Sequence, residues 1–367
     1  MRRVPVARRN LFADWRRLVI SVLGVGVSLM LILLLDGLWA GIRSQVTMYE
    51  DHTGAQLYVV IPGTFNLFAD ASTLSRSAVD EVAAIPGVEW AAPVRTSYTI
   101  LDLHGRKVPV ALVGSVPGQP GGPWAIDEGR APQADDEIVV DSVLAERHDL
   151  HLGDALAVGG ATMRIVGLSS GTAGFMTGFV FVTHHATDLI RHAPDTTSVI
   201  LVGTDQPADV QARLAAAGFT AVDHHTLRSS SLALATKIYG TPLRLMVGVG
   251  FAAGTLVIAL TAYTTIAERR RDYGIVKAIG ATPARLTTLA LAQTLSLALL
   301  GAIAAGVLFL GGREIIEAVR PQFAVVLTVA GALRAAGAGL AMAMLAAIVP
   351  ARRLIRLDPS VAFRSGS

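Results

Sequence analysis

The sequence of 367 residues contains no cysteine, so disulfide scaffolds, thiolate zinc sites and cysteine nucleophiles are excluded. Charged residues are scarce as well: they make up 16% of the chain, against roughly 25% in ordinary globular proteins. Apolar residues make up 52%, and a chain that can bury this much apolar surface does not stay disordered. The composition therefore argues against a set of ordinary soluble domains.

Lysine is rare, and its three occurrences exclude one common nucleotide site. Lys107, Lys237 and Lys277 are preceded by Arg, Thr and Val, whereas a phosphate-binding P-loop needs the order G-x-x-x-x-G-K-[ST]. The chain therefore does not bind ATP by that route.

What the sequence does contain is four long apolar segments. Each is long enough to cross about 30 Å of hydrocarbon as a helix. The first exceeds the apolar stretch of a secretory signal peptide and lacks an A-x-A pattern at its exit, so we expect a retained anchor. The predicted transmembrane segments are residues 18–42, 243–267, 286–312 and 328–349.

The distribution of charge predicts how these segments are oriented. Residues 1–17, 268–285 and 351–367 together carry 15 basic and 4 acidic side chains, whereas residues 43–242 carry 12 basic and 21 acidic ones. Lys and Arg mark cytoplasmic loops. We therefore expect both termini and the loop 268–285 in the cytosol, with residues 43–242 and the loop 313–327 outside. Membrane topology then accounts for the excess of basic residues, and no nucleic-acid partner is expected.

Residues 43–242 have the turn and breaker residues of a mixed α and β domain with two lobes. A helix is predicted over 72–85, where Pro86 and Gly87 stop it. A hairpin is predicted from the alternating stretches 98–103 and 108–114. The predicted fold class is thus four transmembrane α-helices plus an α+β extracytoplasmic domain between the first two.

Catalytic and metal-binding patterns are weak in this domain. Residues 167–171 match the G-x-S-x-G nucleophile elbow, but loop-forming residues follow where that elbow needs a helix. A flexible loop is favoured, and Ser169 as a nucleophile is the alternative. The nine histidines all lie in this domain and are expected on its surface, and the acidic string 135–137 is expected as a solvated turn. No spacing matches a zinc or calcium site, so no catalytic, cofactor-binding or metal-binding residue is predicted.

Two charges fall inside the predicted spans, Asp36 in the first and Arg334 in the fourth. Each lies about six residues, or about 9 Å, inside the outer end of its span. Their depths match, so an intramembrane ion pair is predicted; the alternative is that each side chain snorkels separately to the interface. Small residues also recur four apart within the spans, which permits close helix contact. These pairs are Gly24 with Ser28, Gly250 with Gly254, and Gly301 with Ala305.

Two cytosolic stretches carry a more specific pattern. Residues 268–282 read ERRRDYGIVKAIGAT and residues 350–363 read PARRLIRLDPSVAF. They resemble the E-R-x-x-E-[IF]-G-[IV]-[LM]-[KR]-A-[IL]-G-A-[ST] signature and the closing P-A-R-[RK]-A-[AS]-x-[LI]-[DN]-P-x-[ED]-A-L of the MacB/FtsX-type ABC-transporter permeases. The segments 128–132, 136–140 and 152–154 follow the order of this family too. The resemblance covers essentially the whole chain.

The resemblance implies the permease subunit of a bacterial ABC transporter, a multi-pass protein of the cytoplasmic (inner) membrane that is not itself an enzyme. It implies a homodimer bound to two copies of a separate cytosolic ABC ATPase. That ATPase would hold the ATP and Mg²⁺, so no cofactor is expected in this chain. Hydrolysis would drive movements of the MacB-like periplasmic core domain, a mechanotransmission that exports or extrudes a lipid, lipoprotein, peptide or drug.

Two other functions stay open. One is a mechanotransmitting regulator of a cell-wall hydrolase, and the other is a membrane-anchored extracytoplasmic hydrolase that uses Ser169. Membrane lipid and an extracytoplasmic adaptor or hydrolase are the further partners expected.

The loop 268–285 is the predicted contact with the ATPase, and its local pattern is clear. Ile275 and Ile279 are four apart and share one face of a short helix. Gly280 stands where a helix takes a left-handed stop, and Thr282 with Pro283 suits the start of the third span. The alternative is an elbow that only turns the chain and packs its apolar face under the bundle. The predicted coupling residues are Glu268, Arg269, Asp272, Gly274, Ile275, Ala278, Ile279 and Gly280.

Overall fold

The computed structural model describes residues 15–70, 72–103, 105–175, 177–191, 193–268, 270–278, 280–320 and 323–356. The chain divides into two compact units, and each is described by itself. The helical unit comprises Met1–Gly41, Tyr239–Val319 and Ala324–Ser367. The α/β unit comprises Ile42–Ile238 and Arg320–Phe323.

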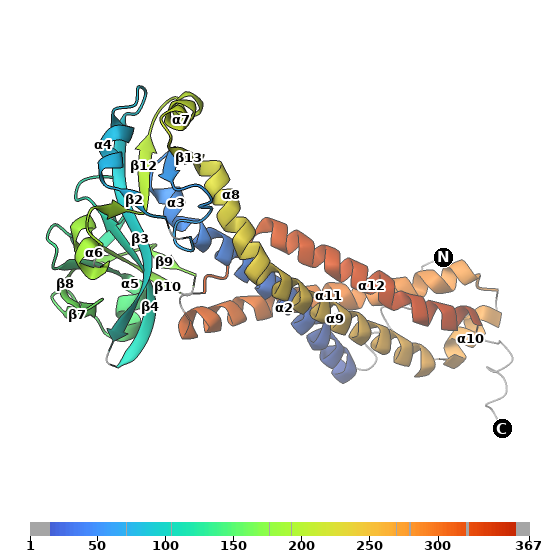
Figure 1. Cartoon of the computed structure of the whole chain (residues 1–367). Helices are drawn as coiled ribbons and strands as arrows, with labels where there is room; N and C mark the ends of the chain where they lie inside the picture. The colour runs from blue at the N-terminus through green and yellow to red at the C-terminus, as the bar shows by residue number, and fades with distance from the viewer. Residues whose placement is uncertain are drawn as a thin grey trace. The chain divides into compact units, whose positions relative to one another are not determined.

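The helical unit is a bundle of long helices that lie side by side (Figure 1). Their large apolar side chains are widely exposed, as at Val249 (69%), Ile303 (62%) and Leu333 (69%). A surface of this kind is stable in lipid and unfavourable in water. The structure has four helices long and apolar enough to cross a membrane. The long helices are α2 (Trp15–Val46), α9 (Thr241–Glu268), α11 (Pro283–Val319) and α12 (Val329–Arg356), and the short α10 (Arg270–Ala278) follows α9.

Small residues allow these helices to approach closely. A methyl group added at Gly254 would lie 3.0 Å from Ser28 Cβ, and one added at Gly301 would lie 2.4 Å from Val25 Cγ1. The predicted small-residue positions therefore pack α2 against α9 and α11 within one chain.

The helix that includes the second span is longer than the sequence pattern indicated. It begins as α8 (His224–Ala235), passes through a π-helical turn η1 (Thr236–Gly240) and continues as α9, so helical residues run unbroken from His224 to Glu268. Single π-helical turns inside α-helices are rare and often occur at functional sites.

One lobe of the α/β unit is a four-stranded antiparallel sheet in the order β13-β1-β12-β3. Its strands and two helices follow one another as β-α-β-β-α-β, a recurrent unit. The apolar faces of the helices cover one side of the sheet. The elements are β1 (Leu57–Val60), α4 (Ser77–Ala83), β3 (Trp90–Leu103), β12 (Val199–Gly203), α7 (Pro207–Ala216) and β13 (Thr220–Asp223).

The other lobe is inserted between β3 and β12 and forms a closed ring of strands. β7 pairs with both β8 and β3, so the path β3-β4-β10-β6-β8 returns to its start. A buried apolar core fills the ring. The two lobes predicted from the sequence are present, and so is the predicted β3–β4 hairpin. The elements are β4 (Arg106–Ser115), β5 (Ile126–Gly129), β6 (Glu137–Asp141), α5 (Ser142–His148), β7 (Ala155–Val158), β8 (Ala161–Ser169), β9 (Ala173–Gly174), β10 (Thr177–Thr183) and α6 (His184–Arg191).

The helix predicted over 72–85 was too long. Its first residues instead form β2 (Leu74–Ser75), which pairs with β11 (Thr196–Thr197), and α4 begins only at Ser77. The partner strand is more than 100 residues away in the sequence, so no local pattern reveals it. Pro86 and Gly87 do follow the end of the helix, as predicted.

A short helix, α3 (Met48–His52), comes directly after α2 and supplies the central aromatic residue of the α/β unit. Tyr49 is 2% exposed, and its hydroxyl donates to Gly121 O at 2.9 Å. Its ring contacts the rings of Phe68, Trp124 and Phe179. α3 is therefore part of this unit's core.

Candidate functional site

The loop between α9 and α11 is a folded elbow. Gly280 has φ +96°, the left-handed stop expected after α10. Its amide donates to Lys277 O at 3.0 Å, and the amide of Ala281 donates to Val276 O at 3.2 Å. Thr282 then accepts the first backbone hydrogen bonds of α11, whose first residue is Pro283. The pattern read from the sequence therefore forms the expected turn.

One face of α10 is fixed to the bundle. Tyr273 is 6% exposed and packs in an apolar cluster with Leu286 of α11 and Leu354 of α12. Lys277 Nζ donates to Ile355 O at 2.7 Å. At the end of α9, Glu268 accepts from Arg17 Nη1 of α2 at 2.5 Å. The elbow is thus held to all three neighbouring helices, α2, α11 and α12.

The other face of α10 is open. Ile275 is 43% exposed, and Ala278 is exposed too. Gly274 is buried, so it belongs to the packed face rather than to the open one. Of the other predicted coupling residues, Arg269 and Ile279 lie outside the described residues, and Asp272 is placed by its backbone in α10 alone.

The two charges predicted inside the spans lie together. Arg334 Nη2 is 2.8 Å from Asp36 Oδ1 and 3.0 Å from Oδ2. A methyl group at Gly331, on the preceding turn of α12, would lie 2.2 Å from Asp36 Oδ2. The carboxylate therefore occupies space that only a glycine leaves at this position.

Ser169 lies in a buried chain of hydrogen bonds. It ends β8, is 0% exposed, and shares a hydrogen bond of 2.7 Å with Thr172 Oγ1. Thr172 in turn donates to Asp141 Oδ2 at 2.7 Å, and burial raises the pKa of that carboxyl. A catalytic serine needs an adjacent base and access to substrate. This buried chain of hydrogen bonds supplies structure instead.

Two sequence expectations about polar residues were wrong. His184 was expected on the surface, but it is 1% exposed, and burial lowers its pKa to about 4. Glu137 was expected in a solvated turn, but it is 3% exposed and accepts hydrogen bonds from both terminal nitrogens of Arg130. Arg130 is the middle residue of the EGRAP segment 128–132, so this segment contributes an ion pair that fixes it to the start of β6. Among the described residues, no group of three His, Asp or Glu could hold a metal ion.

A buried carboxyl that the sequence did not reveal joins α3 to α8. Glu50 is 2% exposed, and Ser231 Oγ donates to Glu50 Oε1 at 3.0 Å. Burial raises the pKa of Glu50 to about 7. Its neighbour Asp51 lies 3.0 Å from Arg228 Nε and 3.4 Å from His224 Nε2, both on α8. No spacing or periodicity marks Glu50, because its partners are about 180 residues away.

Comparison with known families agrees with these features. A model described as "MacB-like periplasmic core domain" matches residues 18–217, which is more than half of the chain, and one described as "FtsX-like permease C-terminal" matches residues 244–359. The chain belongs to the MacB/FtsX-type ABC-transporter permeases. The permease is therefore a multi-pass membrane protein with a MacB-like extracytoplasmic domain after its first helix.

Individual relatives extend along almost the whole permease. Two uncharacterized ABC transporter permeases of Mycobacterium tuberculosis are 28% identical over 350 and 354 residues, which is 95% of each chain compared. Among solved structures, the extracellular domain of the noncanonic ABC-type transporter YknZ from Gram-positive bacteria is 13% identical, with a TM-score of 0.35 over 46% of this chain and 100% of that one. The periplasmic region of MacB from Actinobacillus actinomycetemcomitans is 13% identical, with a TM-score of 0.37 over 48% of this chain and 94% of that one.

Proposed function

We propose that the permease couples ATP hydrolysis by a separate cytosolic ATPase to movement of its extracytoplasmic domain, and thereby exports or extrudes a lipid, lipoprotein, peptide or drug. Two copies of the permease would bind two copies of the ATPase. Both termini and the elbow would face the cytosol, as the 15 basic against 4 acidic residues of the cytosolic segments favour.

The observation that carries this proposal is the two-sided elbow. Tyr273 and Lys277 fix one side of α10 to the bundle, while Ile275 on the other side is 43% exposed. Because the packed side contacts α11 and α12, a force applied to the exposed side would be transmitted to these helices. Helical residues run unbroken from His224 to Glu268, where this elbow begins.

The buried surroundings of Ser169 weigh against the hydrolase alternative, so we propose a subunit without catalytic residues of its own. ATP and Mg²⁺ would then be held by the partner ATPase.

Co-purification tests the proposal. The tagged permease would be expressed with a candidate P-loop ATPase of the same genome, and the pair would be isolated and assayed for ATP hydrolysis in lipid. We expect a stable complex whose ATPase activity exceeds that of the ATPase alone. A permease that never retains an ATPase, in detergent or in lipid, would contradict the proposal.

A further inference from the structure

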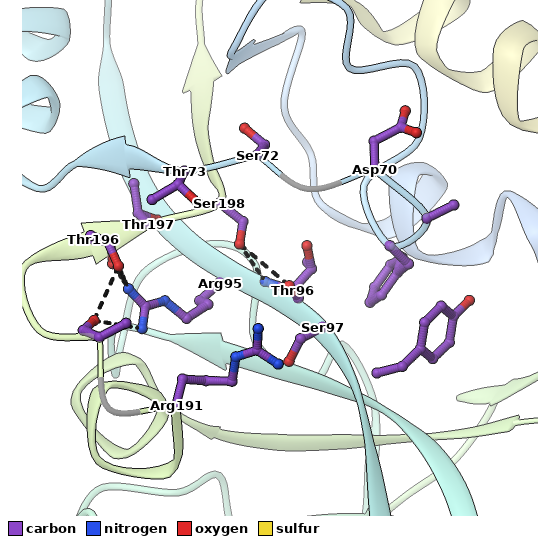
Figure 2. A pocket seen from close by; sticks show the side chains of 14 residues that line it. Asp70, Ser72, Thr73, Arg95, Thr96, Ser97, Arg191, Thr196, Thr197 and Ser198 are labelled. Atoms are coloured by element: carbon purple, nitrogen blue, oxygen red, sulfur yellow. Dashed lines mark hydrogen bonds between the residues drawn. The ribbon is translucent and has the colours of Figure 1, made fainter.

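A polar pocket lies within the α/β unit, between the loop before β2, strand β3 and the segment from the end of α6 to β11. Its cavity volume is about 310 Å³, at the lower end of the range for small-molecule sites. Three stretches of the chain line it: residues 68–70 with 72–73, residues 95–98 of β3, and residues 191, 193 and 196–198. Figure 2 shows that hydroxyl groups dominate its walls. The hydroxyl-bearing residues of the described lining are Ser72, Thr73, Thr96, Ser97, Tyr98, Thr196, Thr197 and Ser198.

One of the two arginines in the lining is a structural part of the wall. Arg95 is almost fully buried, and its Nη1 lies 3.0 Å from Ala193 O and 3.0 Å from Asp188 Oδ1. Its Nη2 donates to Thr196. Arg95 therefore holds the segment after α6 in place through its contacts with Ala193, Thr196 and Asp188.

The second arginine is different. Arg191 ends α6 and is exposed, and no hydrogen bond or ion pair of its side chain is found within the described part of the chain. In Figure 2 its guanidinium points toward Ser97 and Arg95. Ser97 Oγ is buried and has no hydrogen-bond partner in the described structure. Buried hydroxyls are normally paired, because an unpaired one loses its hydration without compensation. A ligand in this pocket would supply hydrogen-bond partners for the Arg191 guanidinium and the Ser97 hydroxyl.

The charges around the pocket favour an anion on this side. Arg76 lies 3.9 Å from Asp188 Oδ2, so Asp188 is shared by Arg76 and Arg95, and Arg191 adds a third positive charge. Burial lowers the pKa of Arg95, the charge of Asp188 raises it, and the charges of Arg191 and Arg76 lower it again. A bound negative charge would relieve this repulsion.

The opposite side of the pocket carries a negative charge. Asp70 Oδ2 accepts from the amides of Phe65 at 2.6 Å and Asn66 at 2.8 Å, which fixes the carboxylate in the wall. Asp70 and Arg191 lie on different sides of the pocket in Figure 2. Asp70 would repel a second anionic group on a ligand, so the site suits a molecule with a negative charge at one end only.

We propose that this pocket binds a small molecule with one anionic head, a carboxylate or a phosphate, on a hydroxylated skeleton. Arg191 and Ser97 would donate to the head, and the hydroxyl-lined wall would pair with the skeleton. The site does not depend on the proposed export function, and nothing in the coupling elbow contributes to it.

Three probes that share a three-carbon skeleton test the charge requirement: glycerol, glycerate and glycerol 3-phosphate. Their binding to the full-length permease in phosphatidylcholine nanodiscs would be measured by calorimetry and by the shift in melting temperature. We expect glycerate or glycerol 3-phosphate to bind and glycerol not to. Vesicles of phosphatidylglycerol distinguish the source of the head: Arg191-dependent binding to these vesicles alone assigns the site to a lipid headgroup.

Matched variants separate a binding site from a structural feature. Arg191→Gln should weaken binding about ten-fold or more, because it removes a charge-assisted pair. Ser97→Ala should weaken it several-fold without lowering the melting temperature of the empty protein, because that hydroxyl has no partner to lose. Arg106→Gln removes the same charge from an exposed position on β4 and should leave binding unchanged.

The proposal is overturned if glycerol binds as well as the two anions, or if none of the probes and vesicles binds. It is equally overturned if Arg106→Gln weakens binding as much as Arg191→Gln. A Ser97→Ala variant that melts earlier but binds normally would assign Ser97 to the fold and contradict its role in the site.

Discussion

Arg334 Nη2 of α12 lies 2.8 and 3.0 Å from the two carboxylate oxygens of Asp36 of α2, and both residues belong to apolar membrane helices. The Asp36 side chain is 15% exposed, whereas that of Arg334 is 59% exposed. An unpaired charge costs about 2.5–3.5 kcal/mol at the centre of a membrane helix. The pair lowers this cost for both residues and links the first and fourth spans near Gly331.

Exchanging the two charges tests whether this pair is needed. Asp36→Arg alone and Arg334→Asp alone each place two like charges together in lipid, so we expect both variants to lose folded protein in the membrane. The double variant restores the attraction and should recover most of it. Fluorescence-detected size exclusion of the solubilised protein measures the folded fraction. Additive losses in the double variant would show that the two side chains act independently.

The burial of Tyr49 predicts which fragments of the α/β unit fold stably on their own. A soluble fragment of residues 43–238 retains Tyr49 and its contacts with three aromatic rings, and we expect it to melt cooperatively. The shorter fragment 50–238 lacks that ring. Loss of a fully buried aromatic side chain costs about 3–5 kcal/mol, so its melting temperature should fall by many degrees. Equal melting temperatures by circular dichroism would show that the Tyr49 ring adds nothing to the core.

Glu50 predicts how the stability of this unit depends on pH. Its folded-state pKa is about 7, raised by burial from 4.5. Between these values the unfolded chain is ionised while the folded chain keeps its proton, so stability falls as pH rises from about 4.5 to 7. Above that range the loss is complete, at about 3 kcal/mol.

Glu50→Gln removes this loss while it keeps a hydrogen-bonding side chain opposite Ser231. We expect the melting temperature of the 43–238 fragment to rise at pH 8 and to change little at pH 4.5. Glu81→Gln on the exposed face of α4 is the control and should show no such difference. The same change at both pH values for Glu50→Gln would mean that its carboxyl is not protonated in the folded state.

Gly280 predicts a conformational rather than a steric requirement at the elbow. A Cβ at this position would meet nothing within 4 Å, but φ is +96°. Gly280→Val should therefore cost about 1–2 kcal/mol through backbone strain alone, while Gly280→Asn, which tolerates this region, should cost less. We expect both proteins to reach the membrane at normal levels, with ATP-dependent activity lost in the valine variant and largely kept in the asparagine variant. Equal activities would show that the left-handed stop is dispensable.

The membrane helices and the elbow were predictable because their signals are local. Lipid demands about 20 consecutive apolar residues for a span, and Gly280 with Pro283 marks the turn within four residues. The β3–β4 hairpin was predictable for the same reason, since its two strands are separated by two residues. Closure of the ring was not predictable, because the paired residues Leu101 of β3 and Val158 of β7 are 57 positions apart. β1 is only four residues long and fully buried, so it shows no alternation.

The functional positions also divide into those that a local sequence signal marks and those that only long-range packing creates. Asp36 and Arg334 stand out because charge is rare in apolar segments, and their matching depth pairs them. Glu50 and Ser97 do not stand out, because an ordinary carboxyl or hydroxyl becomes unusual only when distant segments bury it. His184 was misplaced for that reason: it looks like a surface residue until α6 packs against β3 and β4.

The measurement that tests the account most directly is the ATPase activity of the reconstituted complex with the permease variant Ile275→Asp. Ile275 is 43% exposed on the open side of α10, so the variant should fold and reach the membrane but remove the apolar contact with the ATPase. Ile100→Asp, which alters an isoleucine of β3 that is 58% exposed, is the matched control. We predict that Ile275→Asp loses both ATPase binding and permease-stimulated hydrolysis, while Ile100→Asp keeps both. Wild-type binding and hydrolysis with Ile275→Asp would contradict the assignment of this elbow as the coupling element.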